Sequence, residues 1–164
     1  MNPLVAQELS GPSGLAYTYV NEVGGEDVAV IDGGAAGVCF PDLLLLRGEY
    51  QMRLEPPFIP GMEVAGVVRS APYESAFNPG QRVSAFCMLG GYAERVAVAP
   101  ENIVPTPDDV DDAQAASLFG SGVARLVEAG LRPPPPVRFP LSKGAEALES
   151  LANGGVKGKL VLQP

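Results

Sequence analysis

The chain contains 164 residues, with 11 basic and 19 acidic side chains and a formal net charge of −8, which disfavours nucleic acid and membranes as partners. Histidine is absent, which excludes a Ser–His–Asp or Cys–His nucleophilic site within the chain and the usual histidine ligands of catalytic zinc. The 20 glycines and 17 prolines, in a chain that is 46% hydrophobic, favour a turn-rich β fold over disorder.

The first hundred residues are predicted to be mostly β structure. Apolar runs of strand length alternate with turn signals such as Gly24-Gly25 and Asn78-Pro79-Gly80. One helical turn is expected where Pro41 precedes four leucines, because proline is favoured at the start of a helix. The expected elements are strands at residues 14–19, 27–38, 62–69, 82–88 and 92–98, a helix at 40–46 and a proline-rich loop at 47–61.

The last sixty residues are predicted to carry short helices and one strand. Acidic residues at the start of 108–118 suit the positive end of a helix dipole, and Gly130 is expected to end a helix at 123–130. Nothing in this part resembles a series of parallel βαβ units. The remaining expected elements are an extended piece at 101–104, a polyproline stretch at 133–136, a helix at 142–152 and a strand at 159–162.

The predicted strand at 27–38 has the sequence DVAVIDGGAAGV, which invites comparison with a dinucleotide-binding fingerprint. That fingerprint needs glycines at its first, third and sixth positions and a helix directly afterwards. Counting from Gly33, the third position is Ala35 and the sixth is Val38, and no apolar helix of adequate length follows. We therefore interpret this segment as a strand that ends in small residues. Residues 153–159 (NGGVKGK) likewise do not match a P-loop, which ends in Gly-Lys followed by serine or threonine.

Three blocks of the sequence carry a family resemblance. They are AAGVCFPDLLLLRGEYQ at 35–51, PPFIPGMEVAGVV at 56–68, and FNPGQRVSAF with LGGYAERVAVAPENIVPTPDDVDDAQAASL at 77–86 and 89–118. Together with 139–162 they resemble, in order, the GroES-like catalytic domain of medium-chain dehydrogenases/reductases, in the zinc-independent quinone oxidoreductase branch. The resemblance implies a mainly β fold with short α-helices, namely a GroES-like, partly open β-barrel.

The chain departs from the family pattern after Leu118. The family places a complete Rossmann domain there, whereas this sequence passes through Phe119-Gly120-Ser121-Gly122 directly to a segment similar to the family's return to the catalytic domain. The resemblance therefore implies a GroES-like domain at 1–118, a linker at 119–122 in place of the nucleotide-binding domain, and a C-terminal return segment at 123–164. The glycine- and serine-rich composition of the linker favours an engineered deletion over a natural one.

The resemblance implies that no zinc is bound. Zinc-using members carry Gly-His-Glu where this chain has Gly61-Met62-Glu63, so Met62 replaces a histidine ligand. Cys39 matches the position of a zinc ligand in those members, but a lone thiolate with Glu63 makes a poor tetrahedral site. Cys39 therefore either lines the substrate cleft or fills the core. Cys87 lies alone where the family's structural zinc lobe would be.

The resemblance also implies the residues of a substrate cleft. Tyr50 matches the tyrosine that lines the cleft in related reductases, where its hydroxyl can donate to a quinone or enone oxygen. Glu63 is either an acid with a raised pKa or a carboxylate bonded to arginine or backbone N–H groups. Asp42 is expected to cap or orient the turn at 40–46 beside the cleft. Phe40 and Phe58 either form apolar walls or belong to the core.

Two lysines near the C-terminus, Lys157 and Lys159, either neutralise a cofactor phosphate or lie in a solvated turn. The resemblance implies an NADPH-dependent reductase of quinones or α,β-unsaturated carbonyl compounds, of which this chain holds the substrate-side half. NADPH is thus expected in a full-length parent. For this chain alone we expect no cofactor and negligible activity, because no helix N-terminus of a Rossmann domain receives the pyrophosphate.

The alternative is a non-catalytic minimal domain that binds a small apolar ligand or a protein partner. A GroES-like domain without its Rossmann half would expose an apolar inter-domain face, and such a face can drive self-association. The N-terminus has no basic region followed by a long apolar run, and the leucine block at 43–46 is too short to span a bilayer. We therefore expect a cytoplasmic protein with reduced thiols at Cys39 and Cys87.

Overall fold

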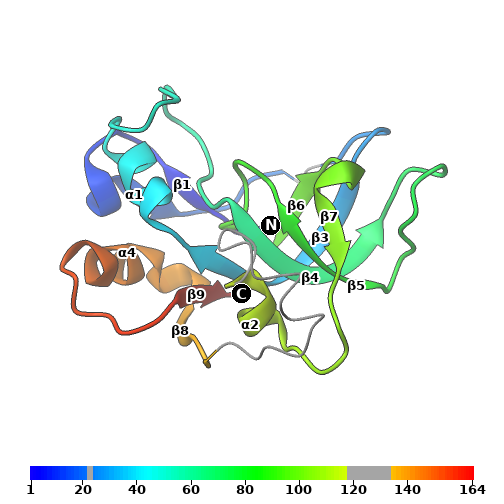
Figure 1. Ribbon diagram of the computed structural model, residues 1–164. Helices are drawn as coiled ribbons and strands as arrows, with labels where there is room; N and C mark the ends of the chain where they lie inside the picture. The colour runs from blue at the N-terminus through cyan, green and yellow to red at the C-terminus, as the bar shows by residue number, and fades with distance from the viewer. Residues whose placement is uncertain (22–23, 118–133) are drawn as a thin grey trace.

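The computed structural model describes residues 1–21, 24–117 and 134–164, which are built mainly from short strands (Figure 1). The expected mainly β fold with short helices is confirmed. The predicted linker at 119–122 and helix at 123–130 lie outside the described residues. The strands are β1 (Leu4–Ala6), β2 (Leu15–Tyr17), β3 (Ala29–Val38), β4 (Glu63–Ser70), β5 (Arg82–Phe86), β6 (Arg95–Val98), β7 (Ile103–Pro105), β8 (Val137–Pro140) and β9 (Leu160–Gln163). The helical elements are η1 (Gly11–Gly14), α1 (Phe40–Leu46), η2 (Pro100–Asn102), α2 (Asp112–Ala116), η4 (Leu141–Lys143) and α4 (Gly144–Ala152).

Strand β3 organises the main sheet, whose order is β7-β5-β4-β3-β9-β8. One edge of β3 pairs with β4 along its length. The other edge pairs with β6 through its first half and with β9 through its second half. Within the described residues the sheet does not close into a barrel, which agrees with the partly open arrangement that was expected. The glycines at 33 and 34 lie inside β3, with a register shift between Gly33 and Ala35, and so belong to a strand.

The C-terminal segment contains one parallel βαβ unit, which the sequence analysis missed. Strand β8 pairs in parallel with β9, and η4 and α4 form the connection between them. The unit docks on the rest of the fold because β9 pairs with β3, placing Leu160, Val161 and Leu162 opposite residues 36–38. The described part of the predicted return segment therefore packs on the sheet, as Figure 1 shows for the orange and red elements.

Three clusters of buried apolar residues stabilise this arrangement. The first joins β1, α1, α4 and β9 and includes the fully buried Leu43, Leu148 and Leu160. The second includes Ile31 and Val83, and the third packs α2 against the sheet. Burying large aliphatic side chains is the main favourable contribution to folding, at about 1.5–3 kcal/mol per side chain. The first cluster explains why the short helices hold their positions at one end of the sheet (Figure 1).

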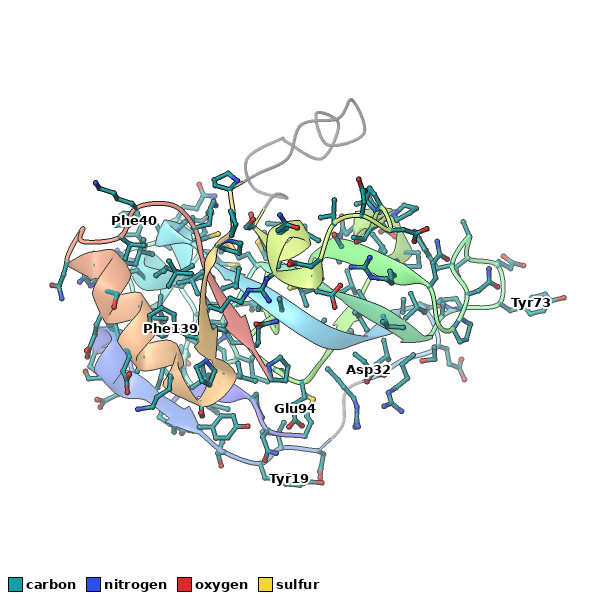
Figure 2. The ribbon with its side chains drawn as sticks, turned by 90° about the horizontal axis from the view of Figure 1, so that it is seen from below. Tyr19, Asp32, Phe40, Tyr73, Glu94 and Phe139 are labelled. Atoms are coloured by element: carbon teal, nitrogen blue, oxygen red, sulfur yellow. The ribbon has the colours of Figure 1, made fainter. Side chains whose placement is uncertain are left out.

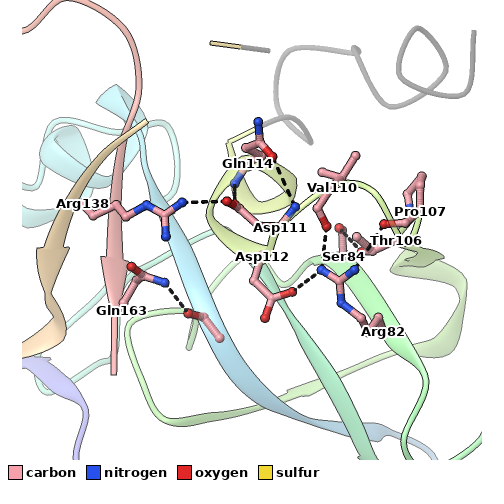
Figure 3. A network of polar contacts seen from close by, with 11 residues as sticks. Arg82, Ser84, Thr106, Pro107, Val110, Asp111, Asp112, Gln114, Arg138 and Gln163 are labelled. Atoms are coloured by element: carbon pink, nitrogen blue, oxygen red, sulfur yellow. Dashed lines mark hydrogen bonds and ion pairs between the residues drawn. The ribbon is translucent and has the colours of Figure 1, made fainter. Parts of the chain in front are cut away.

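Helix α2 is shorter than the predicted helix at 108–118, because residues 107–110 form a turn that ends in the N-cap Asp111. The Asp111 side chain accepts from the Gln114 backbone N–H at 2.8 Å and from Arg138 Nη2 of β8 at 2.6 Å. Arg82 Nη2 of β5 meets Asp112 at 2.7 Å. Figure 3 shows that these contacts connect α2 with strands on both of its sides.

Replacing Asp111 by alanine is expected to destabilise the protein by about 1 to 1.5 kcal/mol, as measured by urea unfolding. Most of this loss comes from the N-cap bond to Gln114, worth about 1 kcal/mol. The pair with Arg138 is half-exposed on both sides, so it adds little. Arg138→Gln is the control, with an expected loss below about 0.5 kcal/mol. An equal loss in both variants would contradict this ranking.

Candidate functional site

A cavity of about 430 Å³ lies where the starts of α1 and β4 meet the end of β5 and the connection from α4 to β9. Its walls are mostly apolar, with a few polar groups among them. Sites for small organic molecules commonly have this size and this mixture. The lining residues are Val38, Cys39, Phe40, Pro41, Tyr50, Met62, Glu63, Phe86, Leu151, Gly158, Lys159 and Leu160.

Six of the residues singled out from the sequence meet in this cavity: Cys39, Phe40, Tyr50, Met62, Glu63 and Lys159. They come from four separate parts of the chain. The pairing of β3 with β4 brings Glu63 close to Cys39, and the pairing of β9 with β3 brings Lys159 there. Phe40 is 55% exposed and projects beside the loop that joins α4 to β9 (Figure 2). Phe58 lies away from this cavity, partly buried against the core cluster of β1 and α1. Lys157 is not among the lining residues.

Asp42 caps the start of α1, as expected, but it is not among the residues that line the cavity and 0% of its surface is exposed. Its carboxylate accepts from the backbone N–H groups of Cys39 at 2.9 Å and Gly61 at 3.2 Å, and from the hydroxyl of Tyr92 at 2.8 Å. Burial raises the pKa of Asp42 to about 6, although these three donors act in the opposite direction. Asp42 thus ties the start of α1 to Gly61, which directly precedes the lining residues Met62 and Glu63, and to Tyr92.

Tyr92 is the partner that the sequence analysis missed. It was expected within a strand at 92–98, but β6 begins only at Arg95, and the Tyr92 side chain is fully buried. Burial and the neighbouring Asp42 carboxylate raise the pKa of Tyr92 well above its ordinary value, so the hydroxyl stays protonated and donates. No local signal in the sequence identifies this contact, because the two residues lie 50 positions apart.

Glu63 begins β4 and is 2% exposed. The described residues supply no hydrogen-bond partner for its Oε2, so the expectation that arginine or backbone N–H groups bind the carboxylate does not hold for this atom. The Glu63 carboxylate is packed tightly against β3, because a Cβ added at Gly37 would lie 2.9 Å from Oε2. Buried carboxylate oxygens without partners are uncommon in folded proteins and frequently occur at functional sites.

The Cys39 thiol faces two carboxyl groups and one ammonium group. Burial raises its pKa first, and the nearby Glu63 and Asp42 raise it further, while Lys159, with Nζ 4.0 Å from Sγ, acts in the opposite direction. The thiol is therefore protonated at neutral pH and is a poor nucleophile. Burial likewise raises the pKa of Cys87 to about 12, and its Sγ donates to the Gly61 carbonyl at 3.2 Å. Both cysteines are free.

Neither a metal centre nor a membrane span is found in the described part of the chain. No group of three or more cysteine, aspartate or glutamate side chains there is arranged to hold a metal ion. The absence of zinc remains a prediction from the replacement of histidine by Met62. No helix among the described residues has the length and apolar character needed to cross a membrane.

A profile of the alcohol dehydrogenase GroES-like domain matches residues 25–108. The chain therefore belongs to the alcohol dehydrogenase GroES-like domain family. The quinone oxidoreductase-like protein 2 homolog of Nematostella vectensis is 32% identical over 123 residues, which are 71% of this chain and 34% of that protein. The quinone oxidoreductase of Mus musculus is 35% identical over 86 residues, which are 51% of this chain and 26% of that protein. The match thus spans about a quarter to a third of these relatives' length.

Solved structures agree with this assignment. A probable oxidoreductase from Mycobacterium abscessus aligns over 100% of this chain and 99% of its own, with a TM-score of 0.94 and 31% identity. The quinone oxidoreductase of Thermus thermophilus, solved also as its complex with NADPH, aligns over 94% of this chain and 51% of its own, with a TM-score of 0.62 and 34% identity. The expected GroES-like fold and the resemblance to medium-chain dehydrogenases/reductases are confirmed.

Proposed function

We propose that this chain is the substrate-side domain of an NADPH-dependent reductase that acts on quinones or α,β-unsaturated carbonyl compounds. The observation that carries the proposal is the convergence of six residues, singled out from four parts of the sequence, on one cavity of about 430 Å³. The names of the relatives, which are quinone oxidoreductases or resemble them, support the substrate class.

The cavity suits the polarisation of a conjugated carbonyl group. Apolar walls exclude water, so a hydrogen bond to the carbonyl oxygen is stronger there than in solution. Tyr50 lines the cavity with a hydroxyl that can donate to that oxygen, and we assign it this role. The protonated Cys39 thiol would leave an electrophilic enone unmodified, because thiolates rather than thiols add to such compounds.

The described residues do not fit the pyrophosphate of a dinucleotide. The βαβ unit formed by β8, α4 and β9 passes from strand to helix through Pro140, Leu141, Ser142, Lys143 and Gly144, which lack the glycine spacing that lets a phosphate approach the backbone. We therefore assign no hydride-transfer step to this chain and expect it to show negligible NADPH-dependent turnover by itself. Turnover of a quinone by the purified chain with NADPH would overturn this expectation.

The order of elements also indicates whether the expected absence of a nucleotide-binding domain between residues 118 and 123 is natural or engineered. The Mycobacterium abscessus protein matches this chain over 99% of its own length. The same succession, a GroES-like fold that leads into β8, α4 and β9, thus has a counterpart in a second protein. This supports a natural junction in place of the engineered deletion that the composition of residues 119–122 favoured.

Exchanging Tyr50 for phenylalanine tests the proposed cavity. With 2-methyl-1,4-naphthoquinone as the ligand and titration followed by heteronuclear NMR, we expect shifts at the lining residues of the wild type. The loss of one hydrogen bond should weaken binding about fivefold in Tyr50→Phe. Tyr73→Phe is the matched control, since Tyr73 is fully exposed and projects at the far end of the molecule (Figure 2). Shifts elsewhere, or equal affinities, would refute the assignment.

A further inference from the structure

Lys159 holds the one positive charge among the residues that line the cavity. It immediately precedes β9, and its Nζ lies 4.0 Å from Cys39 Sγ. In the described part of the chain, no carboxylate forms an ion pair with it. Five other cations there, Arg69, Arg82, Arg95, Arg138 and Lys143, do pair with carboxylates.

An ammonium group in a partly buried, apolar wall is an unfavourable arrangement unless it gains a partner. Removing such a group from water costs free energy that a hydrogen-bonded anion can offset. The neighbouring groups do not neutralise this charge: the Cys39 thiol accepts a weak hydrogen bond from Nζ but is uncharged, and among the described residues the buried Glu63 forms no ion pair with Lys159. The cavity therefore presents an unused positive charge beside an apolar slot.

We propose that Lys159 recognises an anionic oxygen group on the ligand, so that the cavity selects conjugated carbonyl compounds carrying a carboxylate, sulfonate or phenolate. This inference rests on the proposed function, because it takes the cavity to be the ligand site. It differs from both sequence-based alternatives, in which Lys157 and Lys159 either neutralise a cofactor phosphate or lie in a solvated turn, since Lys159 lines the cavity and Lys157 does not.

The two polar anchors then have separate tasks. Tyr50 donates to the neutral carbonyl oxygen, and Lys159 pairs with the anionic substituent, while the aromatic or conjugated body lies against Phe40, Met62 and Phe86. The overall charge of −8 repels anions from the surface. A preference for an anionic ligand over a neutral one of the same shape would therefore have to come from a local cation.

The test uses 2-naphthoate and 2-naphthamide, which share shape and differ in charge, with affinities measured by calorimetry and NMR. We expect wild type to bind 2-naphthoate about tenfold more tightly than 2-naphthamide. In Lys159→Met the preference should fall below about twofold, while the affinity for the amide stays unchanged and reports an intact cavity. Lys159→Gln serves as a second variant if the methionine variant does not fold. Lys143→Met, which removes the same charge from outside the cavity, should keep the wild-type preference.

The outcomes separate this inference from the proposed function. Equal affinities of the wild type for both ligands would overturn the role of Lys159 and leave the cavity as the ligand site. An anion preference that survives in Lys159→Met, or that disappears in Lys143→Met, would also overturn it. Failure of the wild type to bind either ligand, with no shifts at the lining residues, would reject both proposals.

Discussion

Replacing Gly66 by alanine is expected to destabilise the protein by about 3 kcal/mol or more, or to prevent folding. Gly66 lies in β4 opposite Gly33 of β3, next to the register shift in that strand. A Cβ at this position would overlap the backbone carbonyl oxygen of Asp32 and would lie 2.9 Å from the backbone nitrogen of Gly34. Because both groups belong to the paired strand, neither can move without breaking the sheet. Urea unfolding monitored by circular dichroism measures the loss.

Gly155→Ala is the matched control for this prediction. Gly155 lies between α4 and β9, and an added Cβ there would meet no atom within 4 Å. The same change of residue should therefore alter the free energy of unfolding by less than about 0.5 kcal/mol. If Gly66→Ala were as stable as Gly155→Ala, the close approach of β3 and β4 at the register shift would be wrong.

The glycines at 33 and 34 show what the sequence can and cannot reveal. Their failure to match a dinucleotide fingerprint was visible from spacing alone, and the strand was predicted to within two residues. The sequence does not show why glycine is needed at these positions, because the requirement comes from the strand that pairs with β3. Only the register of β3 with β4 shows that the extra residue, Gly34, lets the strand shift past Gly66.

Two strands were missed for the similar reason that their partners are distant in the sequence. Strand β1 was missed because its three residues give no periodic signal, although Leu4 joins it to the Tyr92 backbone by a hydrogen bond. Strand β8 was missed because it follows the run of prolines at 133–136, which favours an extended chain without a partner. It becomes a strand only through pairing with β9. Such pairing depends on tertiary structure, and the local sequence does not contain it.

The cavity residues were predictable because their spacing belongs to a family pattern, whereas the contacts behind them were not. Tyr50, Met62 and Glu63, which the motifs assign to the substrate cleft, line one cavity of the structure. Asp42 is buried outside the cavity, where its carboxylate accepts hydrogen bonds from Cys39, Gly61 and Tyr92. Tyr92 belongs to the quoted block at 89–118, but the sequence does not show that it meets Asp42, because the two residues lie 50 positions apart.

The buried Asp42 makes stability fall as the pH rises. Its pKa goes from 3.8 to about 6 on folding, so the folded protein holds this proton more tightly than the unfolded chain does. The stabilisation from this group is fully present below pH 4 and is lost as the pH passes about 6. The difference between the two pKa values corresponds to roughly 3 kcal/mol. Asp42→Asn removes the titration, so the free energy of unfolding of the wild type should fall by this amount relative to the variant between pH 4 and pH 7.

The sign of this relative change, measured by urea unfolding at a series of pH values, tests the structure directly. Hydrogen bonds from Cys39, Gly61 and Tyr92 favour the carboxylate, and burial together with the neighbouring Glu63 disfavours it. If the hydrogen bonds outweighed burial, the wild type would instead gain stability relative to Asp42→Asn as the pH rises. Tyr92→Phe removes one of the three donors and so should move the midpoint of the fall to higher pH. A midpoint that moves to lower pH would contradict the hydrogen bond by which Tyr92 stabilises the ionised carboxylate behind the cavity wall.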